Sequence, residues 1–590
     1  MRYKVSVVFI ISVMLILLAR VYFLSIKSNT YYEELSKQNY IRRIYEEPPR
    51  GIIEDRNGVA LAVNKLGFSI SLKPHLTHSN QGKDLLKICS FVSKEFPSYD
   101  LKHLLRTYKK LDSPYNHDYI KIIPYVPYKK LFLKYDTFLG FDDIKIKPSL
   151  KRFYPFGKIG AHVVGYVGRA SKSDEANNDI AKYTGIVGKN GLEKYYNELL
   201  QGKLGYKDVK VNALNKDIGI LDYQPTKNNN NLKTTIDIRL QKYIEREFKA
   251  KGGAVIVMNA NTGGILAAAS FPEFDNNIFV DGISTKQWQK LRNDFNHPFT
   301  NKLTNGLYPP GSVIKMGVAT SFLENGLPLD YHIYCKGYIK VGNRYFRCWK
   351  KNGHGRVGFR KALRESCDVF FYDGSLEVGI NKISKTLATF GFGKKTGVDQ
   401  VDEFIGNNPN KVWKKEKYHR PWYIGETVIS AIGQGYTLVT PMQIARYTAG
   451  IATNKLPRPH FSILDYAKPK NLNIPKKDLK LIQEGMYDVA NAVHGTAFSR
   501  NHSKIIIAAK TGTAQVVGIP QSEKKRMHEY QLEYYHKSHA WFTSYGPYKN
   551  PKYVVTVIVE HGGHGGVAAG NLVSKIYNKL YYLGYIKKRR

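Results

Sequence analysis

The longest uninterrupted apolar stretch of the chain lies at its N-terminus. Residues 5–25 are mostly hydrophobic, the stretch is long enough for a helix to cross the hydrocarbon core of a bilayer, and no small-residue cleavage site ends it. Arg2 and Lys4 precede it, so the positive-inside rule places the N-terminus in the cytoplasm. We therefore expect a cytoplasmic tail of residues 1–4, a single transmembrane anchor, and the remaining chain outside the cytoplasmic membrane.

Beyond the anchor, the hydrophobic pattern predicts both strands and helices, that is, an α+β fold. Residues 48–64 indicate two strands joined by a turn, and residues 252–270 indicate a second hairpin. Four consecutive asparagines at 228–231 form the best linker signal in the chain. Because 590 residues are too many for one core, we expect an N-terminal domain over residues 26–231 and a C-terminal domain over residues 232–590.

The net charge is strongly positive, +42, from 90 lysines and arginines against 48 acidic residues. Such an excess suits nucleic acid, anionic lipid or wall polymer as a partner. The basic residues are spread along the whole chain and form no groove-reading motif, so we expect no nucleic acid partner. The basic run at 587–590 is interpreted as a solvated end.

A serine and a lysine three residues apart open a helical pattern in the C-terminal domain. Ser312 and Lys315 follow a Pro-Pro-Gly sequence and precede apolar residues at helical spacing. Side chains three residues apart share one face of a helix, so a hydroxyl lies beside an amine. Burial lowers the pKa of a lysine, which can then accept the serine proton and make the serine nucleophilic. Alone, this spacing is a weak signal, because it often arises by chance.

Two further motifs follow downstream. Ser366 and Asp368 come after a helix-like segment, and a strand-like segment contains the sequence Lys510-Thr511-Gly512-Thr513. The order S-x-x-K, S-x-D/N, K-T-G is the signature of penicillin-binding proteins and serine β-lactamases. Since each motif also stands in its expected helix or strand context, the three together are a strong signal.

Other sequences make the resemblance more specific. They are PPRGxIxDRNG at 48–58, RxYPxG at 152–157, a helix-bearing segment at 185–205, IGQG at 432–435 and HAWF at 539–542. With them, the chain resembles class B penicillin-binding proteins over nearly its whole length. Asp368, with NGHG just upstream, resembles the elongation-specific subfamily, penicillin-binding protein 2, whereas division-specific relatives carry Asn at this place.

This resemblance implies a three-part α+β architecture. A membrane helix precedes an elongated, mostly β pedestal or dimerisation domain, and a transpeptidase domain of the penicillin-binding and β-lactamase type follows, with an antiparallel sheet flanked by helices. The implied function is a peptidoglycan D,D-transpeptidase that cross-links stem peptides ending in D-Ala-D-Ala during wall elongation and is acylated by β-lactams. The implied location is the inner membrane, with a periplasmic catalytic domain, and the implied partners are a RodA-type glycosyltransferase and an MreC-type scaffold.

The resemblance also implies roles for the motif residues. Ser312 would attack the carbonyl group of the penultimate D-alanine, and Lys315 would accept the serine proton. Ser366 would relay a proton to the leaving amine, and Asp368 would hold Lys315 and a substrate amide by hydrogen bonds.

The third motif is expected to bind the substrate. Lys510 would supply positive charge near the substrate carboxylate, Thr511 and Thr513 would offer hydroxyl groups, and Gly512 would let the peptide approach the strand edge. The oxyanion would lie between the backbone N–H groups of Ser312 and Thr513.

Three cysteines and one histidine lie between or within the first two motifs. In an oxidising compartment the default for such cysteines is a disulfide, but three thiolates with one imidazole also form a standard tetrahedral zinc site. We expect one structural zinc ion bound by Cys335, Cys348, His354 and Cys367, with a disulfide or unpaired thiols as alternatives, and no organic cofactor. Cys89 stands apart in an amphipathic segment and is interpreted as a core residue.

Four other functions are weighed against the main one. A β-lactam-sensing receptor would need a signalling module across the membrane, and a β-lactamase would lack the large N-terminal domain. A division-type transpeptidase would share the fold and the chemistry but carry a different second motif. A structural role, in which the N-terminal domain activates a polymerase, is expected to coexist with catalysis.

Overall fold

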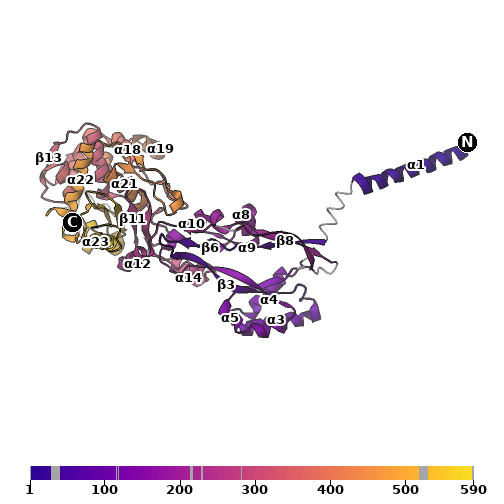
Figure 1. The fold of residues 1–590 in the computed structure, drawn as a ribbon. Coiled ribbons are helices and arrows are strands. Elements are labelled where there is room, and N and C mark those ends of the chain that lie inside the picture. The colour runs from indigo at the N-terminus through magenta and orange to yellow at the C-terminus, as the bar shows by residue number, and fades with distance from the viewer. Residues whose placement is uncertain are drawn as a thin grey trace.

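The molecule is elongated and has three parts, with the N-terminal helix at one end and a large C-terminal lobe at the other (Figure 1). The computed structural model describes residues 2–27, 40–114, 116, 118–212, 217–227, 230–280, 282–516 and 529–587. Helix α1 spans Arg2–Tyr22 and continues into a π-helical turn, Phe23–Lys27. The segment Tyr3–Lys27 has a mean hydropathy of 2.7 and is not buried by any described part of the protein. It is long and apolar enough to cross a membrane, in agreement with the predicted anchor.

The N-terminal domain contains two β-sheets. An antiparallel sheet has the order β1-β8-β9, and a second sheet has the order β10-β2-β3-β4, with β5 also paired to β3. These strands are β1 (Ile41–Glu46), β2 (Ile53–Glu54), β3 (Ala60–Leu72), β4 (Ile120–Pro127), β5 (Ile144–Phe153), β8 (Gly205–Val211), β9 (Asp217–Gln224) and β10 (Leu232–Lys233). A separate pair consists of β6 (Val167–Arg169) and β7 (Ile186–Gly188). The domain boundary expected at residue 232 falls on β10, a strand that pairs with β2 in the N-terminal sheet. The exact position of this boundary stays a prediction.

Short helices cover these sheets. They are α3 (Lys83–Glu95), α4 (Leu101–Leu111), α5 (Tyr128–Phe132), α6 (Tyr135–Leu139), α7 (Ala161–Val164), α8 (Lys172–Asn177), α9 (Asp179–Thr184), α10 (Gly191–Tyr195) and α11 (Asn197–Gln201). The apolar face of α3 packs on α4 and the strands beneath, and Cys89 is buried there as a core residue, as the sequence predicted. These helices therefore add a small second core beside the long β3 strand.

A buried glutamate joins three of the sequence segments on which the family resemblance depends. Glu193 on α10 accepts a hydrogen bond from Arg50 at 2.7 Å and from Arg152 at 2.6 Å, and the Tyr154 hydroxyl donates to it at 3.2 Å. Burial alone would raise the pKa of Glu193, but the charges of Arg152 and Arg50 hold it below its ordinary value. The carboxylate is therefore charged and links segments that lie far apart in sequence.

The C-terminal domain is built on a five-stranded antiparallel sheet. Its order is β12-β11-β21-β20-β19, so the first and the last strands of the domain meet in its centre. The strands are β11 (Gly253–Asn259), β12 (Ile265–Phe271), β19 (Ala508–Ala514), β20 (His539–Gly546) and β21 (Tyr553–Val559). β11 and β12 confirm the second predicted hairpin.

Helices bury both faces of this sheet. On one face α12 (Ile238–Glu247) and α23 (Gly565–Tyr582) pack against Val255 and Val257, and on the other a larger helical layer packs against Ala254 and Ile256. That layer includes α15 (Lys315–Glu324), α17 (Asp368–Val378), α21 (Pro441–Thr453) and α22 (Lys476–Asn491). The remaining helices of the domain are α13 (Asn277–Val280), α14 (Thr285–Arg292), α16 (Phe359–Arg364), α18 (Ile380–Thr389), α19 (Lys411–Tyr418) and α20 (Ile424–Ala431).

The described part of the C-terminal domain also contains three small antiparallel strand pairs outside the central sheet. They are β13 (His332–Cys335) with β16 (Gly355–Gly358), β14 (Tyr338–Val341) with β15 (Arg344–Arg347), and β17 (Lys455–Leu456) with β18 (Lys470–Asn471).

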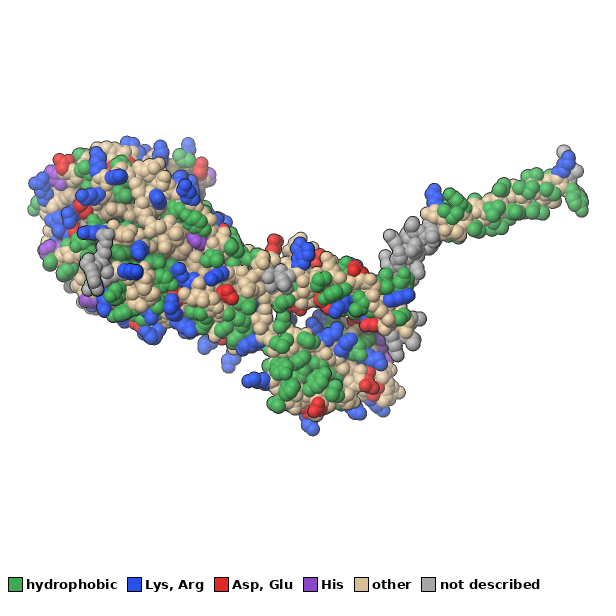
Figure 2. All heavy atoms as spheres, viewed as in Figure 1, with side chains coloured by type: hydrophobic (Ala, Val, Ile, Leu, Met, Phe, Trp, Pro, Cys, Tyr) green, Lys and Arg blue, Asp and Glu red, His purple; other side chains and the backbone are tan. Residues whose placement is uncertain are grey.

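The basic side chains are scattered over the visible face of the molecule instead of forming one patch (Figure 2). This distribution agrees with the interpretation of the net charge, in which the basic residues are spread along the chain.

Replacing Glu193 with alanine should destabilise the N-terminal domain. The buried guanidinium of Arg152 and the half-buried one of Arg50 would lose their anion, and breaking a buried ion pair in this way costs about 3–5 kcal/mol. Urea unfolding of the full chain in detergent measures the change. Glu198→Ala, on the exposed surface of the neighbouring α11, is the matched control and should unfold like the wild type. Equal stability of both variants would contradict a stabilising role for the Glu193 contacts.

Candidate active site

Ser312 lies in a single 3₁₀ turn that leads directly into a helix. The turn η3 spans Gly311–Ile314, and α15 begins with Lys315. Gly311 has a φ of +54°, and a Cβ atom there would lie 2.6 Å from the backbone oxygen of Thr513. Only glycine therefore lets the turn approach β19 so closely, and this contact places Ser312 beside the Thr513 backbone.

The amine of Lys315 is fully buried and hydrogen-bonded. Its Nζ donates to Asp368 Oδ1 at 2.6 Å, to the carbonyl oxygen of Ser366 at 2.9 Å and to Ser366 Oγ at 3.3 Å. Among the described residues, none is hydrogen-bonded to the Ser312 hydroxyl. The expected hydrogen bond between the Ser312 hydroxyl and the Lys315 amine is thus not formed in this structure. Catalytic hydrogen bonds are often long or absent before substrate binds.

Ser366 occupies the bend between α16 and α17. Its φ of +54° lies in the left-handed region, which is uncommon for a residue with a side chain and recurs at functional sites. In this conformation the Oγ atom accepts a hydrogen bond from Lys510 Nζ at 3.0 Å as well as the one from Lys315. A hydroxyl placed between two amines can pass a proton between them and a reacting group.

Asp368 is the first residue of α17, and both of its carboxylate oxygens are engaged. Oδ1 accepts from Lys315, and Oδ2 accepts from the backbone N–H of Trp349 at 2.9 Å. The Trp349 indole donates to the carbonyl oxygen of Glu365 at 3.0 Å, which fixes the tryptophan on the same bend. No sequence signal identified Trp349, because its role depends on a contact between segments 19 residues apart.

Lys510 is fully buried on β19, the strand predicted for the third motif. Beside its bond to Ser366, Nζ donates to the carbonyl oxygen of Thr511 at 2.9 Å. Burial lowers the pKa of Lys510 well below its ordinary value, and the positive charge of Lys315 lowers it further. Two lysines that share one hydroxyl cannot both be charged without repulsion.

The other residues of the third motif, Thr511, Gly512 and Thr513, lie in the contacts between β19 and its neighbouring segments. A Cβ atom on Gly512 would lie 3.0 Å from Val313 Cγ1, so this glycine lets the strand pack on the η3 turn, a reason that the sequence did not reveal. The Thr511 hydroxyl is 2.7 Å from that of Thr496. Thr513 remains partly accessible beside the turn that carries Ser312.

The IGQG sequence forms the loop behind the nucleophile. Gly311 N–H donates to the carbonyl oxygen of Gly433 at 2.9 Å, and Gln434 Nε2 donates to the carbonyl oxygen of Thr513 at 3.1 Å. The sequence used this motif only for the resemblance. Its glycines are the sequence feature that could have indicated this close approach of the loop backbone to the backbone of Gly311.

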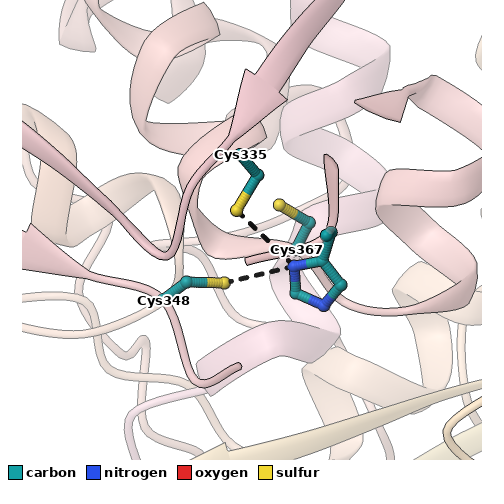
Figure 3. A group of neighbouring side chains, drawn as sticks. Cys335, Cys348 and Cys367 are labelled. Carbon is teal, nitrogen blue, oxygen red and sulfur yellow. Dashed lines mark hydrogen bonds between the residues drawn. The ribbon is translucent and has the colours of Figure 1, made fainter. Parts of the chain in front are cut away.

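The four expected metal ligands lie together, all buried, with their donor atoms within 4.8 Å of one another. Figure 3 shows the three cysteine sulfur atoms directed into one space. His354 Nδ1 is 3.6 Å from Cys335 Sγ and 3.5 Å from Cys348 Sγ. Hydrogen bonds from Cys348 and Cys367 lower the pKa of Cys335, and the thiols of all four cysteines in the chain are free.

Two known protein families match separate parts of the chain. Residues 253–578 match the penicillin-binding protein transpeptidase domain, and residues 45–234 match the penicillin-binding protein dimerisation domain. The chain belongs to the penicillin-binding protein transpeptidases. The three motifs and the pedestal sheets are thus features of one known architecture.

Relatives of this family match almost the full length. The peptidoglycan D,D-transpeptidase MrdA of Escherichia coli K12 is 34% identical over 588 residues, covering 96% of this chain and 91% of its own. The penicillin-binding protein PBP2 of Helicobacter pylori, solved in complex with MreC, is 44% identical with a TM-score of 0.86, covering 92% of this chain and 99% of that one. A chain from a peptidoglycan synthase complex, whose structure describes how polymerization and crosslinking are coordinated, is 26% identical with a TM-score of 0.71. The match covers 100% of this chain and 99% of that one.

Lys315→Met should slow acylation by a β-lactam by about 10²–10⁴-fold, because general-base assistance contributes about that factor. Methionine keeps the length of the side chain and removes the amine. The rate is followed with a fluorescent penicillin, and thermal unfolding of each variant is recorded in parallel. Lys302→Met removes another buried amine, which donates to Phe271 and Asn296 carbonyl groups, and should acylate at the wild-type rate. Normal acylation by Lys315→Met would require another base.

Proposed function

We propose that the protein is a peptidoglycan D,D-transpeptidase of the elongation type. The observation that carries this proposal is the convergence of three separate segments on Ser312. They bring two buried amines, one strained serine and one carboxylate together beside a half-buried hydroxyl. This set of groups can activate a serine and protonate a leaving amine, as acyl transfer requires.

In the first half-reaction, the Oγ atom of Ser312 attacks the carbonyl carbon of the penultimate D-alanine. Lys315 first passes its own proton through the Ser366 hydroxyl to the neutral amine of Lys510 and then, as a neutral amine, accepts the hydroxyl proton of Ser312. The oxyanion is stabilised by the N–H groups of Ser312 and Thr513. The C–N bond then breaks, Ser366 relays a proton to the departing D-alanine, and an acyl-enzyme remains. Its ester is cleaved by the amine of a neighbouring stem, which forms the cross-link and returns the proton to Ser312.

The two lysine amines have different hydrogen-bond partners, and this difference affects their charge. Lys315 has the carboxylate of Asp368 as a partner, whereas Lys510 has only neutral oxygen atoms, so burial favours a neutral Lys510 before substrate binds. A substrate carboxylate would supply the missing anion and favour the charged form. Binding of a peptide with a free C-terminus is thereby coupled to the charge on Lys510.

Location and partners follow from the same family. We place α1 in the inner membrane with the N-terminus in the cytoplasm, because Arg2 and Lys4 precede the apolar segment. The catalytic domain is then periplasmic, where peptidoglycan lies. The relative solved with MreC supports an MreC-type scaffold as a partner. The chain from a synthase complex that couples polymerization with crosslinking supports a glycosyltransferase partner, which we propose to be of the RodA type.

Benzylpenicillin should add one penicilloyl group per chain, on Ser312. Intact-mass analysis followed by peptide mapping detects the adduct and its position. Ser312→Ala should remain unmodified while it unfolds at the wild-type temperature. An adduct on Ser312→Ala would refute the assignment of the nucleophile.

A structural zinc ion at the cysteine cluster is a second part of the proposal. The donor set of Cys335, Cys348, His354 and Cys367 suits zinc, which prefers thiolate and imidazole ligands. The sulfur-to-nitrogen distances of 3.6 and 3.5 Å are close to the separation of about 3.6 Å between such ligands around a tetrahedral zinc ion. Bound there, zinc would fix the loop that holds Asp368 and take no part in the chemistry.

Elemental analysis of chain purified without chelator should find about one zinc ion per chain. Cys335→Ser should lose the metal and slow acylation without changing which serine reacts, because the ion stabilises the fold locally. Cys89→Ser, which alters another buried thiol, should keep both metal and rate. A disulfide among the three clustered cysteines, found by non-reducing mass spectrometry together with absence of zinc, would refute the metal site.

A further inference from the structure

A cavity of about 660 Å³ opens on the C-terminal domain outside the catalytic cluster. Its walls are one face of α18 from Asn381 to Ala388, segments 392–394 and 405–410, helix α19, residues 435–438 after α20, and Leu307. This volume is in the range of pockets that bind small organic ligands. None of the catalytic motif residues lines it, and the reaction described above does not use it.

One wall of the cavity is aromatic. Trp413 and Tyr418 of α19 and Tyr436 form a triangle with ring centroids 5.4–5.6 Å apart. Tyr418 is 44% exposed, and Lys417 Nζ lies 5.5 Å from the Trp413 ring centroid and 5.9 Å from that of Tyr418, so a ligand on these rings would also meet that amine. Flat rings that are partly open to solvent offer a face for the C–H side of a sugar ring, an apolar body with polar edges.

The other walls carry amides and positive charge. Four asparagines line the cavity, at 381, 407, 408 and 410. Each side-chain amide already forms a hydrogen bond within the protein, and the remaining amide oxygen or nitrogen atom of Asn381, Asn407 and Asn408 can bond a ligand. Lys385, Lys394 and Lys417 line it as well, all are exposed, and none forms an ion pair with a described residue. No lining residue is acidic, and Glu426, which the Tyr436 hydroxyl contacts, is already paired with Lys414.

The cavity and the active site share one loop. Gly433 and Gln434 contact the backbone of Gly311 and Thr513, and the next two residues, Gly435 and Tyr436, line the cavity. A ligand in the cavity would thus lie behind the turn that carries the nucleophile, on the same polymer-facing domain.

We propose that this cavity binds a second disaccharide-peptide unit of peptidoglycan, with its N-acetylated sugars on the aromatic wall and the carboxylates of its acidic peptide on the lysines. The inference rests on the proposed transpeptidase function and adds to it a site for a part of the polymer that does not react. Sugar rings, acetamido groups and carboxylates are the three chemistries for which the rings, amides and lysines provide partners. The site would hold the strand while a stem peptide reacts at Ser312.

The test is a calorimetric titration of the full chain with a disaccharide-tetrapeptide, which lacks the D-Ala-D-Ala bond and cannot acylate Ser312. It is run on protein before and after acylation by benzylpenicillin, so that the acylation step reports on the transpeptidase assignment and the titration reports on the cavity. Saturable binding is expected in both forms. Trp413→Ala and Lys417→Glu should each weaken it by about tenfold, the usual loss for one aromatic or charged contact.

Lys415→Glu is the matched control, because it makes the same charge change on α19 two residues away, outside the cavity lining. It should bind like the wild type, and all three variants should acylate at the wild-type rate. Sugar-free tetrapeptide and peptide-free disaccharide should each bind less tightly than the intact unit. Wild-type affinity in both Trp413→Ala and Lys417→Glu, or equal losses in Lys415→Glu, would overturn the inference even where acylation is normal.

Discussion

The ion pair between Lys315 and Asp368 is the interaction on which the catalytic arrangement depends. Both groups are buried, and an unpaired buried ammonium would be too costly to keep. Asp368 begins α17, where the helix dipole favours a negative charge, and Lys315 begins α15. The pair therefore joins the starts of two helices and fixes the distance between the first and second motifs.

Close backbone approach is the complementary constraint on the third motif. Gly311, Gly433 and Gly512 stand where η3, the loop after α20 and β19 meet, and a Cβ atom at any of them would come within 3.0 Å of a neighbouring group. Side chains at these positions would push β19 away from the nucleophile. The glycines thus determine how near Thr513 lies to Ser312, while the buried ion pair determines where the base lies.

The sequence predicted the architecture well, because short motifs keep their local element. The predicted site residues of the three motifs lie together, while their catalytic roles stay a prediction. The strand of Lys510 and the hairpin at 252–270 needed only local pattern. Tertiary contacts decided what was missed. The helix expected within 185–205 is two helices, α10 and α11, since Tyr196 between them leaves helical geometry and its hydroxyl donates to Asp399 of the C-terminal domain at 2.9 Å. The left-handed conformation of Ser366 likewise has no signal in the sequence.

The cysteine cluster reaches the active site through two adjacent residues. Cys348 Sγ accepts the backbone N–H of Asp368 at 3.4 Å, and the next residue, Trp349, donates its own backbone N–H to the Asp368 carboxylate. One turn of chain therefore holds both the backbone and the side chain of Asp368. Because Asp368 in turn holds Lys315, two hydrogen bonds link Cys348 to the Lys315 amine without involving Ser312. The position of this amine therefore depends on the segment between β15 and β16 as well as on the three motifs.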